Sequence, residues 1–214
     1  MIPFGSAQMP WLIVMLVATA LLVASDWRGS RLGVWVFKPL ASLGFVAYGL
    51  AVGIESWSDR WLFVALCACA VADVLLIPED ERAFLAGVGC FGLGHACFAV
   101  AFALRAVHPL TTVLAAVPLA LFAWRVYRWL APGVPAELKG PVAGYCAIIT
   151  VMVALAFGSA VAIPDPRVAL GAVMFFVSDL SVARDRFVAP GFVNRLWGLP
   201  LYYAAQVVLA TTAA

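Results

Sequence analysis

The stretch Phe175-Phe-Val-Ser-Asp-Leu-Ser-Val-Ala-Arg-Asp-Arg186 places a carboxylate, Asp179, in a segment that otherwise has the character of a membrane helix. From Val168 to Ala183, Asp179 is the only charged residue. An ionised side chain at membrane depth is unfavourable by at least ~2.5 kcal/mol unless it is paired or hydrated. This segment therefore predicts a membrane helix, and it predicts that Asp179 has either a partner or a task.

The composition of the whole chain agrees with a membrane location. Hydrophobic residues make up 65% of the 214 residues and charged residues 11%, against roughly 25% charged residues in a soluble domain. The length allows roughly seven to nine spans of about 20 residues, so we expect one transmembrane domain over residues 1–214. Residues 1–25 carry no side-chain charge, and the basic start of a signal peptide is missing, so we expect an uncleaved first span.

Apolar runs bounded by charges, Pro or Gly predict the secondary structure. The loops between the runs are short, which favours antiparallel packing of neighbours in sequence. We therefore predict an all-α, polytopic membrane protein with a single bundle of eight transmembrane helices. The expected helices cover residues 8–25, 33–53, 60–77, 83–104, 109–130, 140–163, 167–184 and 196–213.

Lys and Arg in the loops predict the orientation. The second, fourth and sixth loops hold three of them, Arg60, Arg105 and Arg167, and Lys38 lies within the second helix. The first, third, fifth and seventh loops hold nine: Arg28, Arg31, Arg82, Arg125, Arg128, Lys139, Arg184, Arg186 and Arg195. This bias predicts that the odd loops are cytoplasmic and both termini outside, in a bacterial inner membrane. A net charge of +2 provides no basic patch for nucleic acid.

Three buried ionisable residues lie at a similar depth. With a rise of about 1.5 Å per residue, Lys38 lies ~9 Å, Asp73 ~6 Å and Asp179 ~8 Å from the cytoplasmic ends of their helices. We expect them to meet in one polar pocket. The structural alternative is an ion pair of Lys38 with Asp73 and a separately hydrogen-bonded Asp179, although this leaves a negative charge without a counterion.

Other polar residues in the spans have plainer explanations as well. A lone intramembrane histidine such as His95 commonly serves packing, and His108 lies at an external helix end, so the chain lacks the three ligands of a zinc hydrolase and we expect no metal site. Ser178 and Ser181 flank Asp179, but no His base is near in sequence to activate them. We expect these serines to hydrogen-bond within the helix or to the carboxylate.

The last helix adds a polar face. Tyr202 and Gln206 are four residues apart and share one side of the helix, which we expect to point inward. For Tyr203 we expect an anchoring position at the membrane interface, and Asn194 comes just before the helix. Five cysteines in apolar stretches, odd in number, predict neither disulfides nor a zinc site: Cys67, Cys69, Cys90, Cys97 and Cys146.

Five motifs in order give the chain a resemblance to a known family. They are Phe37-Lys-Pro-Leu40, Ala72-Asp-Val-Leu-Leu76, Gly94-His95 with Phe98, Val177-Ser-Asp-Leu180 and Leu199-Pro-Leu-Tyr-Tyr-Ala-Ala-Gln206. Together they resemble the lysoplasmalogenase family of YhhN-type membrane proteins over nearly the whole chain. Ala72 is a departure, because many relatives have Gly before the first aspartate.

The resemblance implies hydrolysis of the vinyl ether bond of a lysoplasmalogen, to a fatty aldehyde and glycerophosphocholine or glycerophosphoethanolamine. Such a reaction needs an acid beside a stabilising anion, and two buried carboxylates can divide these roles. We expect Asp179 to be the general acid and Asp73 to stay anionic and orient water, with no cofactor. The expected substrate-binding residues are Lys38, His95, Ser178, Asn194, Tyr202 and Gln206.

Two other classes of function stay open. A small-solute or lipid transporter could use the same buried charges as an ion relay. Lys38 to Asp73 spans 35 residues and Lys139 to Asp179 spans 40, which fits two parallel four-helix halves. Broken helices beside the aspartates would favour transport, and unbroken helices around a lipid-sized cavity would favour the hydrolase. A noncatalytic lipid-binding or scaffold role is the third possibility.

Overall fold

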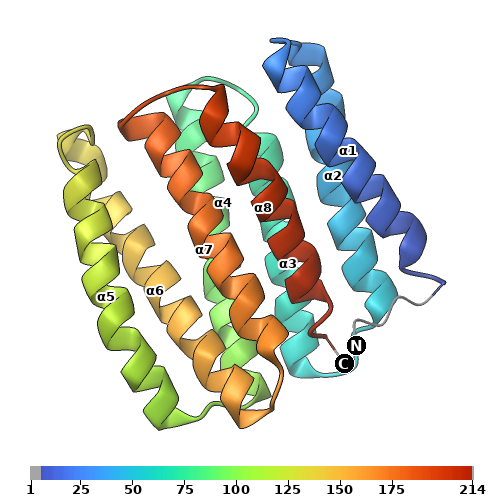
Figure 1. Ribbon diagram of the computed structural model, residues 1–214, viewed down its shortest axis with the longest axis vertical. Helices are drawn as coiled ribbons and strands as arrows, with labels where there is room; N and C mark the ends of the chain where they lie inside the picture. Colours follow the sequence, from blue (N-terminus) through green and yellow to red (C-terminus); the bar gives the residue numbers. More distant parts are fainter. Residues whose placement is uncertain (1–5, 214) are drawn as a thin grey trace.

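Figure 1 shows a computed structural model of the chain, which describes residues 6–213. The predicted single domain also includes residues 1–5 and 214, which lie outside the described residues. The same holds for residues 1–5 of the uncharged N-terminal segment. In residues 6–213 all regular secondary-structure elements are helices, which confirms the all-α prediction. The elements are α1 (Met9–Trp27), α2 (Arg31–Val52), α3 (Trp57–Leu75), α4 (Glu81–Arg105), α5 (Pro109–Leu130), the 3-10 helix η1 (Ala136–Leu138), α6 (Lys139–Ala162), α7 (Pro166–Phe187) and α8 (Phe192–Ala210).

Helix boundaries follow from local chemistry. The predicted range 109–130 coincides with α5, and the other helices begin and end within four residues of the expected positions. Ser56 and Asp59 form a reciprocal capping box at the start of α3, which satisfies backbone N–H groups that a helix start leaves unpaired. Between α1 and α2, Gly29 adopts a φ of 66°, a left-handed conformation that favours glycine in a tight turn.

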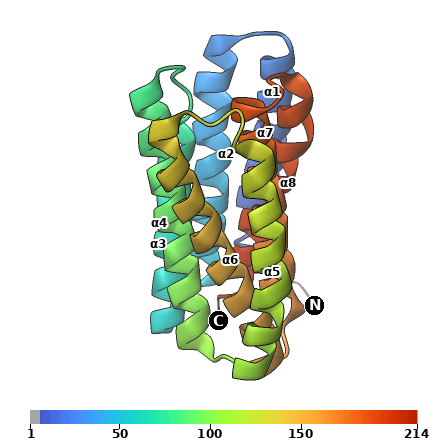
Figure 2. The same ribbon diagram turned by 90° about the vertical axis from the view of Figure 1, so that its left-hand side faces the viewer.

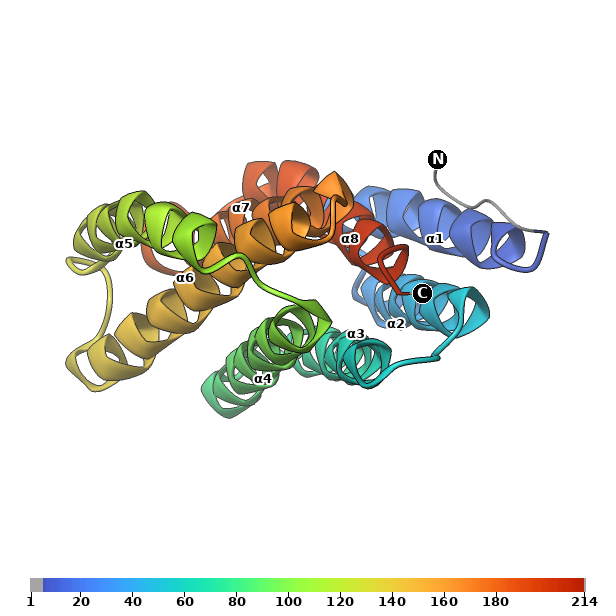
Figure 3. The same ribbon diagram turned by 90° about the horizontal axis from the view of Figure 1, so that it is seen from below.

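The helices pack as four antiparallel pairs, α1 with α2, α3 with α4, α5 with α6 and α7 with α8. The α1–α2, α3–α4, α5–α6 and α7–α8 connections lie at one end of the bundle, called here the odd-loop end, and the last described residues lie at the other (Figure 1). Seen from below, α4, α3 and α2 follow one another on one side and α7, α8 and α1 on the other (Figure 3). Helix α8 contacts α1, α2, α3 and α7, and its second half, residues 201–210, is largely buried between them.

Helix α5 lies at the rim of the bundle and contacts mainly α6 (Figure 2). Only Ala123 and Leu130 of its residues are buried. Large apolar side chains such as Leu114, Val117 and Leu121 are exposed along its outer side. A soluble protein rarely exposes an apolar surface of this extent, whereas lipid covers it at no cost.

Six helices are long and apolar enough to cross a membrane: α1, α2, α4, α5, α6 and α7. The chain is therefore a multi-pass integral membrane protein. Polar residues distinguish the other two helices. Asp59, Arg60 and Asp73 lie in α3, and Arg195 and Gln206 lie in α8. These two helices contact each other, and Asp73 of α3 and Tyr202 of α8 meet in the polar site described below.

Opposite the odd-loop end, two arginines hold the end of α8. Arg105 and Arg167 donate to the carbonyl oxygens of Thr212 and Thr211, each at 2.8 Å, and both arginines also bond Asp165, the residue that caps α7. Burial raises the pKa of Asp165, but the hydrogen bonds from Arg167 and Arg105 outweigh it and leave the pKa below the usual 3.8. This cluster fixes the relative positions of α4, α7 and α8.

Candidate active site

A cavity of about 700 Å³ reaches from the odd-loop end into the bundle. Its wall includes Asp26 and Glu79 near the ends of α1 and α3, and Lys38, Asp73 and Asp179 further along the helices. The prediction that these three buried ionisable residues meet in one pocket is thus confirmed. A volume of this size lies within the range of small-molecule binding sites in proteins.

Asp73, in the wall of this polar cavity, has three polar side chains as partners. Its Oδ2 atom accepts hydrogen bonds from Ser42 at 2.7 Å and from Tyr202 at 2.8 Å, and the Lys38 ammonium lies 3.8 Å from Oδ1. Lys38 and Ser42 are four residues apart, so α2 presents both on one face. Charge-assisted hydrogen bonds of this kind favour the carboxylate form. The structural ion pair considered above exists, and it is part of the cavity wall.

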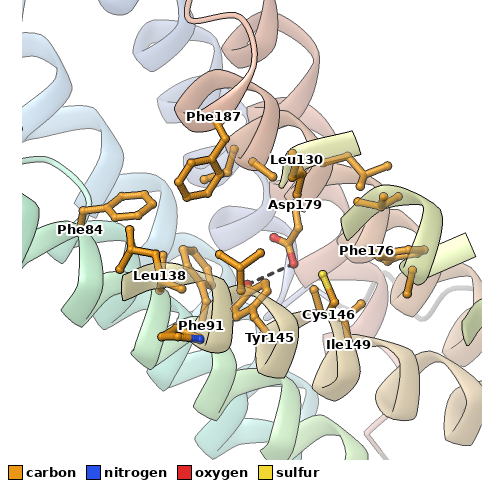
Figure 4. Close-up of a pocket in the computed structure, with 18 of the residues that line it drawn as sticks. Phe84, Phe91, Leu130, Leu138, Tyr145, Cys146, Ile149, Phe176, Asp179 and Phe187 are labelled. Carbon is orange, nitrogen blue, oxygen red and sulfur yellow. Dashed lines mark hydrogen bonds between the residues drawn. The ribbon is translucent and has the colours of Figure 1, made fainter. Parts of the chain in front are cut away.

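Asp179 makes a different set of contacts from α7. His95 of α4 bonds its Oδ2 atom through Nε2 at 2.8 Å, and the Tyr145 hydroxyl of α6 donates to the same oxygen at 3.2 Å. Figure 4 shows the bond between Tyr145 and Asp179. The His95 ring is fully buried and stacks on Phe175 with ring centroids 4.1 Å apart. Each aspartate is therefore held by side chains from two other helices.

A second cavity, of about 100 Å³, adjoins the first and is apolar. Helices α4, α5, α6 and α7 supply its wall, with Phe84, Leu130, Tyr145 and Phe176 pointing into it (Figure 4). Asp179 is the one charged residue among those that line it. The two cavities share five wall residues: Leu76, Phe84, Phe91, Asp179 and Val182. Asp179 therefore lies where a polar compartment meets an apolar one.

The remaining expected site residues are placed as follows. Ser178 lies in the wall of the polar cavity, but its hydroxyl donates to the Phe175 carbonyl within α7 at 2.6 Å. Gln206 is fully buried, with its side-chain amide beside the Cys69 thiol. Asn194 bonds Arg184 and, through its amide N–H groups, Asp185, Ala189 and Gly191. Its hydrogen-bonding groups are thus used within the α7–α8 connection.

The expectation for Tyr203 is wrong. Its side chain is 1% exposed and donates to the Lys38 carbonyl at 3.3 Å. The tyrosine faces α2 in the interior, because α8 is surrounded by other helices and has no broad lipid-facing side at this level. The five cysteines are free thiols. Among residues 6–213, no group of three His, Cys, Asp or Glu side chains is arranged to hold a metal ion.

Two site residues were missing from the sequence analysis. Ser42 could have been found by its spacing of four from Lys38. Tyr145 carried a weaker signal, a phenol group six residues into α6 in an otherwise apolar segment, Gly144-Tyr-Cys-Ala-Ile-Ile149. Interfacial tyrosines are common near the ends of membrane helices, so only the structure distinguishes Tyr145 from an anchor.

The fold and the site define a class of protein: a multi-pass helical membrane protein in which two carboxylates line an internal cavity with a polar and an apolar part. Comparison with known proteins makes the class specific. The chain belongs to the YhhN family, whose family model matches residues 33–213.

Curated relatives share much of the chain. Lysoplasmalogenase TMEM86A of Bos taurus is 30% identical over 177 residues, covering 80% of this chain and 72% of the relative. Lysoplasmalogenase TMEM86B of Sus scrofa is 31% identical over 89% of this chain and 79% of its own length. A lysoplasmalogenase of Mycobacterium bovis is 33% identical over 71% of this chain and 59% of its own length. No solved structure gives a significant match.

Proposed function

We propose that this chain is a membrane-embedded hydrolase that cleaves the vinyl ether bond of lysoplasmalogens. The observation that carries the proposal is the place of Asp179 in the walls of both cavities. A lysoplasmalogen has an apolar alkenyl chain and a polar glycerophosphate group, and the vinyl ether joins the two. A substrate that occupies both cavities would hold this bond beside Asp179. The names of the relatives, lysoplasmalogenases from mammals and mycobacteria, support the same activity.

The proposed reaction is acid–base hydrolysis with water. The acid gives a proton to the alkene carbon that does not carry oxygen, and the π electrons form the new C–H bond. The remaining oxocarbenium ion is captured by water, which gives a proton back to the carboxylate left by the acid and forms a hemiacetal. The hemiacetal collapses to the fatty aldehyde and releases the glycerol hydroxyl of glycerophosphocholine or glycerophosphoethanolamine. Positioned acids and bases of this type contribute about 10²–10⁴-fold to a rate.

The two aspartates divide these roles. Asp179 is the general acid, because it lies at the junction where the vinyl ether would be. Asp73 stays anionic, because Ser42 and Tyr202 donate to it and Lys38 is near. The Asp73 carboxylate orients the attacking water and stabilises the oxocarbenium ion. The reaction needs water alone and no cofactor.

The polar cavity would hold the glycerophosphate group. Lys38 and Tyr202 lie in its wall, and the Lys38 ammonium is far enough from Asp73 to interact with the substrate phosphate as well. Ser178 lies in the same wall and can serve as a further polar contact. His95, Asn194 and Gln206 are absent from both walls, so we assign them no contact with the substrate.

We further propose that all eight helices of this single domain span the membrane, including α3 and α8. The excess of Lys and Arg in the odd loops supports a cytoplasmic odd-loop end and termini outside. In a bacterium, the polar cavity would then open to the cytoplasm from the inner membrane. The glycerophosphate product would leave to the cytoplasm, and the surrounding bilayer would supply the substrate.

Transport of a small solute or lipid is the weaker alternative. Asp73 and Asp179 lie in continuous helices, α3 and α7, whereas the sites of many transporters are formed where helices are interrupted. The relatives bear the name of an enzyme. A noncatalytic scaffold has no evident use for two carboxylates in a cavity wall.

Aldehyde release from an alkenyl lysophospholipid, measured with the detergent-purified protein, tests the proposal. Asp73→Asn and Asp179→Asn should each lower kcat/KM by roughly 10²–10⁴-fold without loss of folding. Glu137→Gln is the matched control, since this carboxylate is exposed in η1 and lines neither cavity. Full activity of either Asn variant would exclude the assigned role. Absence of aldehyde with the wild type, across head groups and chain lengths, would favour transport, which flux in liposomes would then test.

A further inference from the structure

His95 contacts Asp179 in a way that leaves one carboxyl oxygen available. His95 and Tyr145 both bond Oδ2, at 2.8 and 3.2 Å. Oδ1 makes no hydrogen bond to any described residue and is not among the buried unpaired atoms, so it is open to the cavity. Two partners on the same oxygen fix the plane of the carboxyl group. The atom that faces the substrate is therefore Oδ1.

The surroundings of His95 indicate its protonation state. The ring lies between Phe175 of α7, stacked at 4.1 Å, and Tyr145 of α6, edge-on at 5.5 Å. Asp179 is the charged group that contacts it. The Nδ1 atom is buried and has no partner within residues 6–213. A charged imidazolium would bury an unsatisfied N–H at Nδ1, which is unfavourable. The neutral ring with its proton on Nε2 donates to Asp179 and leaves Nδ1 bare.

We infer that His95 is a positioning residue for the general acid Asp179, assisted by Tyr145, and that it makes no contact with the substrate. This inference rests on the proposed function. Before proton transfer, Asp179 carries its proton on Oδ1, and Oδ2 is a carbonyl oxygen that accepts from His95 and Tyr145. After the proton has moved to the alkene carbon, the same donors stabilise the new carboxylate.

No hydrogen bond has to be rearranged during this step. Oδ2 is an acceptor in both protonation states of Asp179, so both donors stay in place. A hydrogen bond to a charged oxygen is stronger than one to a neutral oxygen, so the contribution of His95 increases as the carboxylate forms. An interaction that strengthens on the way to the transition state raises kcat without tightening substrate binding. An effect on kcat alone therefore distinguishes a positioning role of His95 from the substrate-binding role expected from the sequence.

Three variants and a control test the inference by aldehyde release. His95→Leu should lower kcat by roughly 10- to 150-fold, the loss of one hydrogen bond to a charged group, with KM within twofold of the wild type. His95→Gln should recover part of kcat, because its amide N–H can donate to Oδ2. Tyr145→Phe should have a smaller effect on kcat, because its bond is longer. Phe98→Leu, also fully buried on α4 and packed against Phe175, controls for packing and should keep kcat.

Three kinetic results would overturn the inference. The first is an unchanged kcat in His95→Leu, and the second is a raised KM with normal kcat in that variant. The third is an equal loss of kcat in His95→Leu, His95→Gln and Phe98→Leu. A measurement independent of turnover separates this inference from the proposed function. The ¹⁵N resonances of His95 should show a neutral ring protonated on Nε2, and they should shift in Asp179→Asn. A charged ring, or a proton on Nδ1, would refute the positioning role even in an active enzyme.

Discussion

The hydrogen bond from Tyr202 to Asp73 gives a sharp test of the anionic role of Asp73. Tyr202→Phe removes one hydroxyl, which donates to Oδ2 at 2.8 Å, and leaves the Ser42 and Lys38 contacts. The aromatic ring keeps its edge-on contacts with Phe45 and Phe91. The change therefore deletes one donor from the carboxylate and little packing.

The expected loss of kcat/KM in Tyr202→Phe follows from the kind of hydrogen bond that is removed. A hydrogen bond to a charged group contributes about 1.5–3 kcal/mol, and every 1.36 kcal/mol of transition-state stabilisation is a factor of ten in rate. If Asp73 stabilises the oxocarbenium ion as an anion, kcat/KM for aldehyde release should fall by roughly 10- to 150-fold. The thermal unfolding midpoint of the purified protein should stay close to that of the wild type.

Tyr203→Phe is the matched control, because the neighbouring hydroxyl donates to the backbone carbonyl of Lys38 and to no carboxylate. Its kcat/KM should stay within about twofold, since the lost hydrogen bond to the Lys38 carbonyl joins two neutral groups and removes no donor from the Asp73 carboxylate. Ser42→Ala combined with Tyr202→Phe should not be additive, because both donors bond one oxygen. A folded Tyr202→Phe variant with normal kcat/KM would refute the role assigned to Asp73.

Two further predictions concern stability. An alanine Cβ at Gly44 would lie 2.7 Å from Met15 Cβ and 2.9 Å from Met15 Cα, so Gly44→Ala should destabilise the protein by about 1–3 kcal/mol. A Cβ at Gly89 would have, apart from its own helix, no atom of residues 6–213 within 4 Å, so Gly89→Ala should match or exceed the wild type in thermal unfolding. Equal midpoints for both variants would contradict the close packing of α1 and α2. The pKa of Asp165 lies below 3.8, so its ion pair with Arg167 contributes fully above pH 3.8 and is lost as the pH falls through the lower folded-state pKa. Asp165→Asn should therefore lower the unfolding midpoint at neutral pH, and this difference should shrink in acid; a constant difference would contradict it.

Most of the fold could be predicted from the sequence because hydrophobic runs in a membrane protein are long and their ends are marked. Helix α5 begins at Pro109 and ends at Leu130, just before the Pro- and Gly-containing segment Ala131-Pro-Gly-Val-Pro135. The interior position of α8 was harder to predict. Its polar residues suggested one inward face, but burial of Tyr203 on another face depends on contacts with three non-adjacent helices, α1, α2 and α3, which no local pattern encodes.

The charged residues of the site could be predicted from the sequence, but only some of their hydrogen-bond partners could. The depths of Lys38, Asp73 and Asp179 could be calculated from helical rise, and a charge in an apolar segment stands out. Tyr145 and Ser42 do not stand out, because tyrosine and serine occur throughout membrane helices for other reasons. The pairing of His95 with Asp179 joins residues 84 positions apart and depends on how α4 approaches α7, which sequence spacing does not determine.

The junction of the two cavities at Asp179 also bears on what happens after the bond is broken. Under the proposed function, the intact substrate would gain affinity from both compartments at once, because its two halves are tethered. In the proposed reaction each product retains only one of these two sets of contacts. The aldehyde and the glycerophosphate each bind less tightly than the molecule they came from, so accumulated products compete poorly with fresh substrate. The same geometry that would orient the reaction would then also limit product inhibition.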